Sequence, residues 1–323
     1  MAENMPNYLQ FNNYLGFRYF ALTSFMAFTL CILLELQFLM KPEYKMPTPV
    51  GISHNHISAF FQGRMGNHLF LYASLIGIAN STNMEPFVPP DCSLWDILEL
   101  KAKKGGRSYH HLGRYIYFKE NLSNTYDART QEFDTDTYID ESYLQSWRYF
   151  NHIRNTIKEH YTFKPEIKNA AEKYIQNVVR NDPKGVTKIG IHIRRGDFLQ
   201  DYFKDYGYVV ATADYIHKAM KYMREQFQSH RFFICTDDHS WARLNIPESL
   251  DVTFVSSTSA IDDFALLASM DHMIMTQGSF GWWAAYLAGG TTVYFTGYPR
   301  PGSELDKQFN KRDYYLSEWI GMA

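Results

Sequence analysis

Cysteine is scarce in this sequence, which has only three among 323 residues, at Cys31, Cys92 and Cys235. No CxxC pair and no cluster of histidine with cysteine occurs, so the sequence gives no support for a structural zinc site. Cys235 ends the apolar run Phe232–Cys235, which favours a small buried core residue over a disulfide partner. A Cys92–Cys235 bridge is the alternative.

An excess of charge of either sign is also lacking. The chain has 32 Lys and Arg against 34 Asp and Glu, a formal net charge of -2 at pH 7, which argues against nucleic acid as a partner. The phosphate-loop pattern GxxxxGK and the dinucleotide fingerprint GxGxxG are both missing. Any nucleotide site must therefore depend on other local groups of residues.

The front of the chain carries a long apolar run from Phe17 to Met40. A helix of about 20 apolar residues spans a bilayer, so the run predicts an uncleaved transmembrane signal anchor over 17–40. The run is long for a cleavable signal peptide, and no small-x-small cleavage site follows it. A cleaved signal peptide and a buried soluble helix are the alternatives.

The anchor divides the chain into a short cytoplasmic head at 1–16 and a proline-bearing stem at 41–55, followed by the body. Basic residues lie on both sides of the run, so the positive-inside count does not decide the orientation. We place the body on the lumenal side because the mass of the chain follows the anchor. Glycosylation sequons at Asn80 and Asn121 fit that placement.

Apolar patterning predicts an α/β body. A strand at 56–61, a glycine-bearing loop at 63–67 and helical spacing over 68–79 come first. Beyond residue 183, short apolar runs alternate with helical stretches, as in a parallel sheet covered by helices. The expected strands there are 188–193, 231–235, 251–255, 272–275 and 291–295; the expected helices are 164–181, 214–228, 238–244, 261–270 and 280–288. Proline and glycine breaks leave 81–136 without a firm prediction.

Four loops are expected at the carboxyl ends of strands, where open α/β sheets bind their ligands. They are Gly63–Asn67, His192–Asp197, Thr236–His239 and Thr276–Ser279. Their expected clustering at one edge is the main indication of a functional site.

The loop His192-Ile193-Arg194-Arg195-Gly196-Asp197 carries the strongest signal. The planar guanidinium of Arg194 can bind two phosphate oxygens at once and neutralise a departing diphosphate, which predicts a nucleotide diphosphate as ligand. A surface ion pair of Arg194 or Arg195 with Asp197 is the alternative, although exposed pairs contribute only about 0–1 kcal/mol. His192 alternates inward and is either part of the site or a core histidine.

The other loops offer backbone and carboxylate groups. Gly63 and Gly66 let backbone approach a ligand, or simply form a tight turn. Asp237 or Asp238 can accept from ribose hydroxyls or a base amine, and Asp238 can instead cap a helix. The aspartate pair can also bind Mg²⁺, but no DxD-type triplet occurs in this loop.

The fourth loop opens a helix at Ser279 and Phe280. Its backbone N–H groups and the Ser279 hydroxyl form either an anion site or an ordinary helix cap. Trp282 and Trp283 can stack on a sugar, but their place within a helix favours core packing.

Together these motifs resemble the fucosyltransferases that carry His-x-Arg-Arg-x-Asp, and most closely the galactoside α-1,2-fucosyltransferase family. The similar segments are 63–73, 143–150, 192–197, 233–238 and 263–287. The match at 192–197 is complete, and the likeness covers about residues 57–295. The chain departs from the family at His68, where the family has Gln, and at Thr276–Gly281, where it has Asn-Ser-(Ser/Thr)-Phe-Ser.

The resemblance implies a GT-B-like fold of two Rossmann-like halves facing a cleft, an acceptor-side half at 56–182 and a nucleotide-sugar half at 183–323. It also implies an inverting, metal-independent glycosyltransferase that moves L-fucose from GDP-fucose to a galactose hydroxyl of a glycan in α-1,2 linkage. Such an enzyme would be a single-pass type II protein of the Golgi membrane.

The same resemblance assigns roles to residues. Arg194 would hold the diphosphate and stabilise the departing GDP, and Asn67 would lie near the transferred sugar. Asp237 or Asp238 would bind the nucleoside, and Ser279 with Phe280 would bind the phosphates. The other residues expected to contact the donor are His192, Arg195, Gly63 and Gly66. Asp197 is our candidate for the general base, with Asp201 and Asp205 behind it.

Two other functions are kept as alternatives. One is a fucosyltransferase that acts on a peptide or on a core glycan. The other is a non-catalytic, membrane-tethered glycan-binding relative of such enzymes.

Overall fold

The computed structural model describes residues 55–105, 116–256 and 259–323. The expected head, the anchor at 17–40 and all but the last residue of the stem lie outside these ranges. None of the helices within them combines the length and apolar character needed to cross a bilayer. The described residues form the body that the sequence predicts from residue 56 onward.

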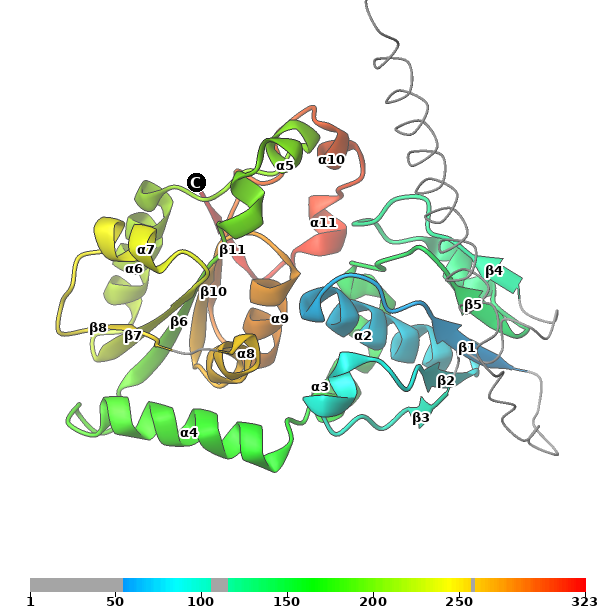
Figure 1. Ribbon diagram of the computed structural model, residues 1–323, viewed down its shortest axis with the longest axis horizontal. Helices are drawn as coiled ribbons and strands as arrows, with labels where there is room; N and C mark the ends of the chain where they lie inside the picture. The colour runs from blue at the N-terminus through cyan, green and yellow to red at the C-terminus, as the bar shows by residue number, and fades with distance from the viewer. Residues whose placement is uncertain (1–54, 106–115, 257–258) are drawn as a thin grey trace, which may run out of the picture. The chain divides into compact units, whose positions relative to one another are not determined.

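The first sheet of this body has five parallel strands in the order β3-β2-β1-β5-β4 (Figure 1). They are β1 (His56–Ala59), β2 (Glu85–Val88), β3 (Lys103–Lys104), β4 (Ile116–Phe118) and β5 (Thr137–Ile139). Helix α2 (Met65–Thr82) leaves β1 through the glycine-bearing loop and ends at Asn83, whose φ of 54° is left-handed. Most of α2 is buried, which explains why its sequence is apolar on nearly every face.

The second sheet has six parallel strands in the order β11-β10-β9-β6-β7-β8. They are β6 (Thr187–Ile193), β7 (His230–Thr236), β8 (Val252–Phe254), β9 (His272–Met275), β10 (Thr292–Phe295) and β11 (Ile320–Met322). The chain builds outward from β6 to β8 and then returns to place β9 on the other side of β6. Ligands of doubly wound sheets bind beside such a reversal, here between the ends of β6 and β9.

Helices connect these strands and cover them. The α-helices after α2 are α3 (Arg154–His160), α4 (Pro165–Val179), α5 (Asp201–Tyr206), α6 (Ala213–Gln226), α7 (His239–Asn245), α8 (Ala260–Ala268), α9 (Ser279–Ala288), α10 (Glu304–Lys307) and α11 (Lys311–Tyr314). Short 3-10 turns lie at η1 (Ser93–Asp96), η3 (Ala128–Glu132), η4 (Trp147–Tyr149), η5 (Asn151–Ile153) and η6 (Gly196–Leu199).

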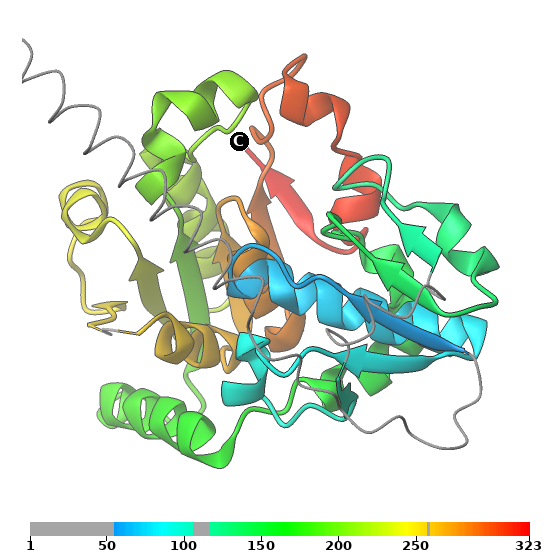
Figure 2. The ribbon, with the colours of Figure 1, turned by 45° about the vertical axis from the view of Figure 1, so that its right-hand side comes forward.

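Helices α2 and α9 pack against each other between the two sheets (Figures 1 and 2). Aromatic side chains fill this contact. The Phe70 and Trp282 rings lie 4.5 Å apart, and Trp283 stacks on Tyr161 at 4.6 Å. Trp282 and Trp283 are fully buried, which confirms the prediction that they belong to the core. The N-termini of α2 and α9, which carry two of the four expected loops, are thereby fixed next to each other.

The segment that contains α10 and α11 returns to the first half. The Asn310 N–H donates to the Asn124 carbonyl at 3.1 Å, and the Tyr126 N–H donates to the Asp313 carboxylate at 3.0 Å. The Trp147 indole donates to the Tyr315 carbonyl at 3.1 Å. Both halves of the chain therefore contribute to the packing of this segment.

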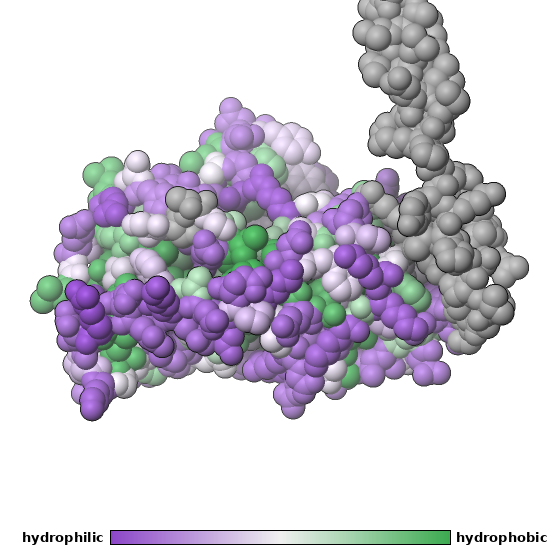
Figure 3. Space-filling view, turned by 60° about the horizontal axis from the view of Figure 1, so that its bottom comes forward, coloured by the Kyte–Doolittle hydropathy of each residue, from purple (hydrophilic) through white to green (hydrophobic). Residues whose placement is uncertain are grey.

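Helix α4 shows how the outer surface is built. Its buried side chains are Ala171 and Ile175, one turn apart, while most of its other positions are polar and at least partly exposed. The face of the body drawn in Figure 3 is mostly hydrophilic, with hydrophobic residues in small separate patches. The apolar stripe of α4 is thus turned toward the core.

Expectation and structure agree most closely in the second half. The expected strands from 188 to 295 and the five expected helices from 164 to 288 are all present within two residues of their expected ends. Strands β2 to β5 and β11 were not foreseen, because they are short or lie among proline and glycine breaks. Cys92 and Cys235 are both buried and free, so they form no disulfide.

Candidate functional site

The four expected loops come together in the structure. Arg64, after β1, pairs with Asp197, after β6, at 2.8 Å. Asp197 and the residue after β7, Asp237, both bind Arg194, and Ser279 at the start of α9 donates to the Asn67 amide oxygen at 2.9 Å. Each loop therefore contacts at least one of the others through a polar side chain.

The backbone of Arg194 is held at the reversal point of the second sheet. Its N–H donates to the Thr276 hydroxyl at 2.9 Å, and its carbonyl accepts from the Gln277 amide at 2.7 Å. Thr276 and Gln277 are fully buried at the end of β9. The side chain of Arg194 consequently leaves the sheet from a fixed position.

Two carboxylates and an aromatic ring hold the Arg194 guanidinium. One terminal nitrogen binds Asp237, the other binds Asp197, and the group lies 5.2 Å from the Phe198 ring centroid. The side chain is 22 % exposed, so it is still reached by solvent. The close approach of Asp237 depends on Gly196, where an added Cβ would lie 2.4 Å from the Asp237 carboxylate.

Asp197 lies between two arginines, because its second oxygen accepts from Arg64. The ion pair that the sequence left as the alternative for Arg194 and Asp197 is thus present, but within a partly buried network. The Arg64 side chain is 73 % exposed and comes from the loop before α2. This network joins the loops of the two sheets by charge.

Arg195 is placed differently from Arg194. Its Nε donates to Asp238 at 3.1 Å, and its guanidinium lies 3.9 Å from the Trp241 ring centroid. Asp238 also caps α7 by accepting from the Trp241 N–H at 3.0 Å, as its capping alternative foresaw. Asp237 faces the other way and accepts from the Arg195 N–H at 2.9 Å. Arg195 is therefore fixed to the start of α7.

His192 is buried behind the site. Its ring stacks on Phe280 at 4.9 Å, and an added Cβ at Gly281 would lie 2.5 Å from its Nδ1. Burial, helped by the charge of Arg194, lowers the pKa of His192 to about 3. The imidazole is neutral at physiological pH and supports Phe280 from within the core.

The glycines of the first loop let α2 approach α9. A Cβ on Gly66 would lie 2.7 Å from the Phe280 backbone nitrogen, and one on Gly63 would lie 2.2 Å from the Asn67 amide nitrogen. Gly63 also has a left-handed φ of 85°. Gly278, rather than Ser279, is the N-cap of α9, which leaves the Ser279 hydroxyl to bind Asn67. The approach of a ligand to these glycines stays a prediction, because the close contacts that they allow here are with Asn67 and α9.

The remaining predicted positions are exposed. Asp201 and Asp205 lie on α5, where Asp201 is 95 % exposed, so neither shares the Arg194 network. Asn80, near the end of α2, and Asn121 are both on the surface. Within residues 55–105, 116–256 and 259–323, no group of three or more His, Cys, Asp or Glu is arranged to hold a metal ion.

Some residues of the site were not foreseen from the sequence. Arg64 stands between the two glycines of the first loop, yet nothing in the loop predicted its pairing with Asp197. Gln145, whose amide donates to Asn67 at 2.9 Å, lies 78 residues away in the chain. The available signal for Gln145 was its place in the similar segment 143–150.

Comparisons with known proteins agree with this arrangement. The family model described as glycosyl transferase family 11 matches residues 47–323. Galactoside alpha-(1,2)-fucosyltransferase 1 of Saimiri sciureus is 31% identical over 80% of this chain and 73% of its own length. Galactoside alpha-(1,2)-fucosyltransferase 2 of Sus scrofa is 30% identical over 80% of this chain and 78% of its own length.

Two solved structures share the fold. NodZ alpha-1,6-fucosyltransferase soaked with GDP-fucose gives a TM-score of 0.51 at 15% identity and covers 76% of this chain and 96% of its own. A variant of Arabidopsis thaliana FUT1 in complex with GDP gives a TM-score of 0.53 at 13% identity, with coverages of 76% and 71%. These likenesses confirm the GT-B-like α/β fold with its parallel sheets. The family model covers the whole described body and the two relatives are 30–31% identical, so the chain belongs to glycosyl transferase family 11.

Proposed function

We propose that the protein transfers L-fucose from GDP-fucose to a galactose hydroxyl of a glycan, with inversion at the fucose carbon and formation of an α-1,2 linkage. The relatives from Saimiri sciureus and Sus scrofa are named as galactoside α-1,2-fucosyltransferases. The two solved structures of similar fold were obtained with GDP-fucose or GDP. We propose that no metal is required, because an arginine and a helix N-terminus can together hold a diphosphate.

The observation that carries the proposal is the position of Arg194. Its backbone binds Thr276 and Gln277, in the loop that opens α9, and its guanidinium binds Asp197 and Asp237 at the reversal of the second sheet. The N-terminus of α9 adds unpaired backbone N–H groups and a partial positive charge. In the proposed reaction both stabilise the charge that grows on GDP as the glycosyl bond breaks.

The carboxylates around Arg194 take part in this step. Arg194 turns N–H groups toward the phosphates, and Asp237, which binds it in the free protein, becomes available to the nucleoside. Asp197 stays our candidate for the general base. Both of its oxygens bind arginines, and each oxygen keeps a second lone pair with which Asp197 can accept the acceptor proton.

We also propose that the body lies in the Golgi lumen behind a type II anchor at 17–40. The length of the apolar run supports an anchor, and the exposure of Asn80 and Asn121 makes both sequons accessible to glycosylation. A gel shift on glycosidase treatment of the expressed full chain tests the lumenal placement. The absence of a shift would count against it.

The full chain, incubated with GDP-fucose, tests the reaction. We expect transfer to a lactose-type acceptor, with linkage analysis showing fucose at the 2-hydroxyl of galactose, and no transfer to a peptide. Transfer to a peptide or core-glycan acceptor alone would favour the second fucosyltransferase hypothesis. GDP binding without any transfer would favour the non-catalytic relative, and the absence of GDP binding in calorimetry would contradict the proposal.

A further inference from the structure

The amide oxygen of Asn67 accepts two hydrogen bonds. One comes from the Gln145 amide at 2.9 Å and the other from the Ser279 hydroxyl at 2.9 Å. A carbonyl-type oxygen has two lone pairs, so its accepting capacity is filled. The amide nitrogen then lies on the opposite side, over Gly63, where an added Cβ would come within 2.2 Å of it.

Gln145 holds its own orientation through a second hydrogen bond. Its amide oxygen accepts from the Asn124 side chain at 2.8 Å, which leaves its NH₂ group to face Asn67. Asn124 is buried, and its backbone is paired with the segment 308–310. In the structure, the Asn124 amide donates to Gln145 and the Gln145 amide donates to Asn67.

The backbone at Gln145 is set by a buried carboxyl group. Glu120 accepts from the N–H groups of Tyr143 at 2.6 Å and of Leu144 at 3.2 Å. Leu144 has a left-handed φ of 50°, which a residue with a Cβ adopts only where its surroundings enforce it. Glu120 therefore fixes the strained turn from which the Gln145 side chain leaves.

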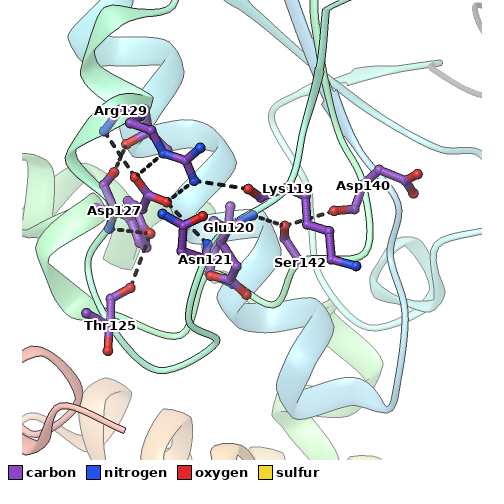
Figure 4. A network of polar contacts seen from close by, with 11 residues as sticks. Lys119, Glu120, Asn121, Thr125, Asp127, Arg129, Asp140 and Ser142 are labelled. Carbon is purple, nitrogen blue, oxygen red and sulfur yellow. Dashed lines mark hydrogen bonds and ion pairs between the residues drawn. The ribbon is translucent and has the colours of Figure 1, made fainter. Parts of the chain in front are cut away.

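Further contacts keep Glu120 in place. Its backbone N–H donates to the Ser142 hydroxyl at 2.9 Å, and that hydroxyl donates to the Asp140 carbonyl at 2.9 Å, as Figure 4 shows. Asp127 and Arg129 pair on the other side of the same loop (Figure 4). None of these groups lies in the Arg194 network, and Gln145 is the side chain that connects them to Asn67.

We propose that Gln145 is a positioning residue that fixes the amide of Asn67 so that its NH₂ group, and not its oxygen, is presented to the sugar nucleotide. The inference rests on the proposed function for the identity of the ligand. An NH₂ group beside the start of α9 adds a hydrogen-bond donor where the phosphates carry negative charge. A reversed amide would place an oxygen there and repel the same ligand.

Gln145→Glu tests this with almost no change in shape. The new carboxylate can still accept from Asn124 but cannot donate to Asn67, so the Asn67 amide is expected to reverse and donate to it. Loss of one hydrogen bond to a charged ligand is worth about 1.5–3 kcal/mol. We therefore expect calorimetry to show an affinity for GDP-fucose lower by about 10- to 100-fold.

Two controls separate positioning from a general loss of structure. Gln176→Glu makes the same change on the exposed face of α4 and should leave affinity within about twofold. In an Asn67→Ala background, Gln145→Glu should lose most of its effect on affinity, because there is no amide left to reverse and only the direct repulsion by the added charge remains.

The proposal is overturned if Gln145→Glu binds GDP-fucose like the wild type, or if its effect persists undiminished in the Asn67→Ala background. Donor binding by the wild type without fucose transfer would contradict the proposed function and leave this inference standing.

Discussion

Two groups of carboxylates in this protein are held in opposite ways. Asp197 and Asp237, at the edge of the second sheet, face the guanidinium of Arg194 and are partly exposed. Glu120, between the strands of the first half, is buried and faces two backbone N–H groups. Burial raises the pKa of Glu120 to about 8, although its backbone hydrogen bonds oppose the shift.

This difference separates carboxylates that can take part in ligand binding from a carboxyl group that only stabilises the backbone. Ion pairs in reach of solvent can exchange one partner for an anionic ligand at modest cost, because both partners are rehydrated or paired again. A buried carboxyl without a cationic partner is neutral at pH 7 and cannot exchange in this way. The second half therefore carries the responsive charges, and the first half carries a fixed hydrogen-bonded frame.

Arg194→Ala should give the largest effect. Removal of a donor that stabilises growing negative charge costs about 3–4 kcal/mol, so we expect kcat for fucose transfer to fall about 10²- to 10³-fold. Arg195→Ala should cost less activity, because Arg195 is bound to Asp238 and Trp241 at the start of α7. Steady-state kinetics of both variants check this, and equal losses would contradict the distinction between the two arginines.

Glu120→Gln should change how stability depends on pH. Between the ordinary carboxyl pKa of 4.5 and the raised pKa of about 8, the folded protein binds a proton that the unfolded chain does not. The contribution of Glu120 to the free energy of unfolding is therefore complete below pH 4.5 and is lost as pH rises to 8, by about 2 kcal/mol between pH 6 and 7.5.

The neutral glutamine should remove this dependence. Denaturant unfolding at several pH values measures it, with Glu166→Gln on the exposed face of α4 as the matched control. If the free energies of unfolding of Glu120→Gln and the wild type fall equally from pH 6 to 7.5, Glu120 is ionised in the folded protein. Glu120 would then not differ from Asp197 in its charge.

The sequence predicted the second half better than the first for a physical reason. Strands such as Thr187–Ile193 are buried on both faces, so they are continuous apolar runs that end abruptly at polar loops. In the first half, β3 has two residues and β5 has three, too few for any periodicity to be recognised. Their places are set by pairing with β1 and β2 rather than by their own sequence.

The site shows the same limit. The four loops could be foreseen because parallel strands end at one edge, and the structure brings them together. The partner of each side chain could not be foreseen. Whether Asp238 binds Arg195 or caps α7 is decided by distance, and the structure shows that it does both.

Arg64→Ala should have the smallest effect on stability. It tests whether the ion pairs around Asp197 are as weak as their exposure to solvent suggests. The Arg64 side chain is largely exposed, so its pair with Asp197 should contribute less than about 1 kcal/mol to stability and should weaken further with salt. Thermal unfolding at low and high salt checks this. A larger loss of stability that does not depend on salt would contradict this. It would mean that Arg64 has a structural role like that of the buried Glu120 and is not one of the exchangeable ion pairs around Arg194.

The return of the segment around α10 and α11 to the first half has a consequence for biosynthesis. Asn124, Tyr126 and Trp147 are made early, but their partners Asn310, Asp313 and Tyr315 leave the ribosome more than 150 residues later. The first half emerges before the loops that follow β4 and β5, which carry Glu120 and Gln145, have all their contacts. Its last contacts must wait for late translation, so a chaperone that protects this nascent intermediate would act on the first half.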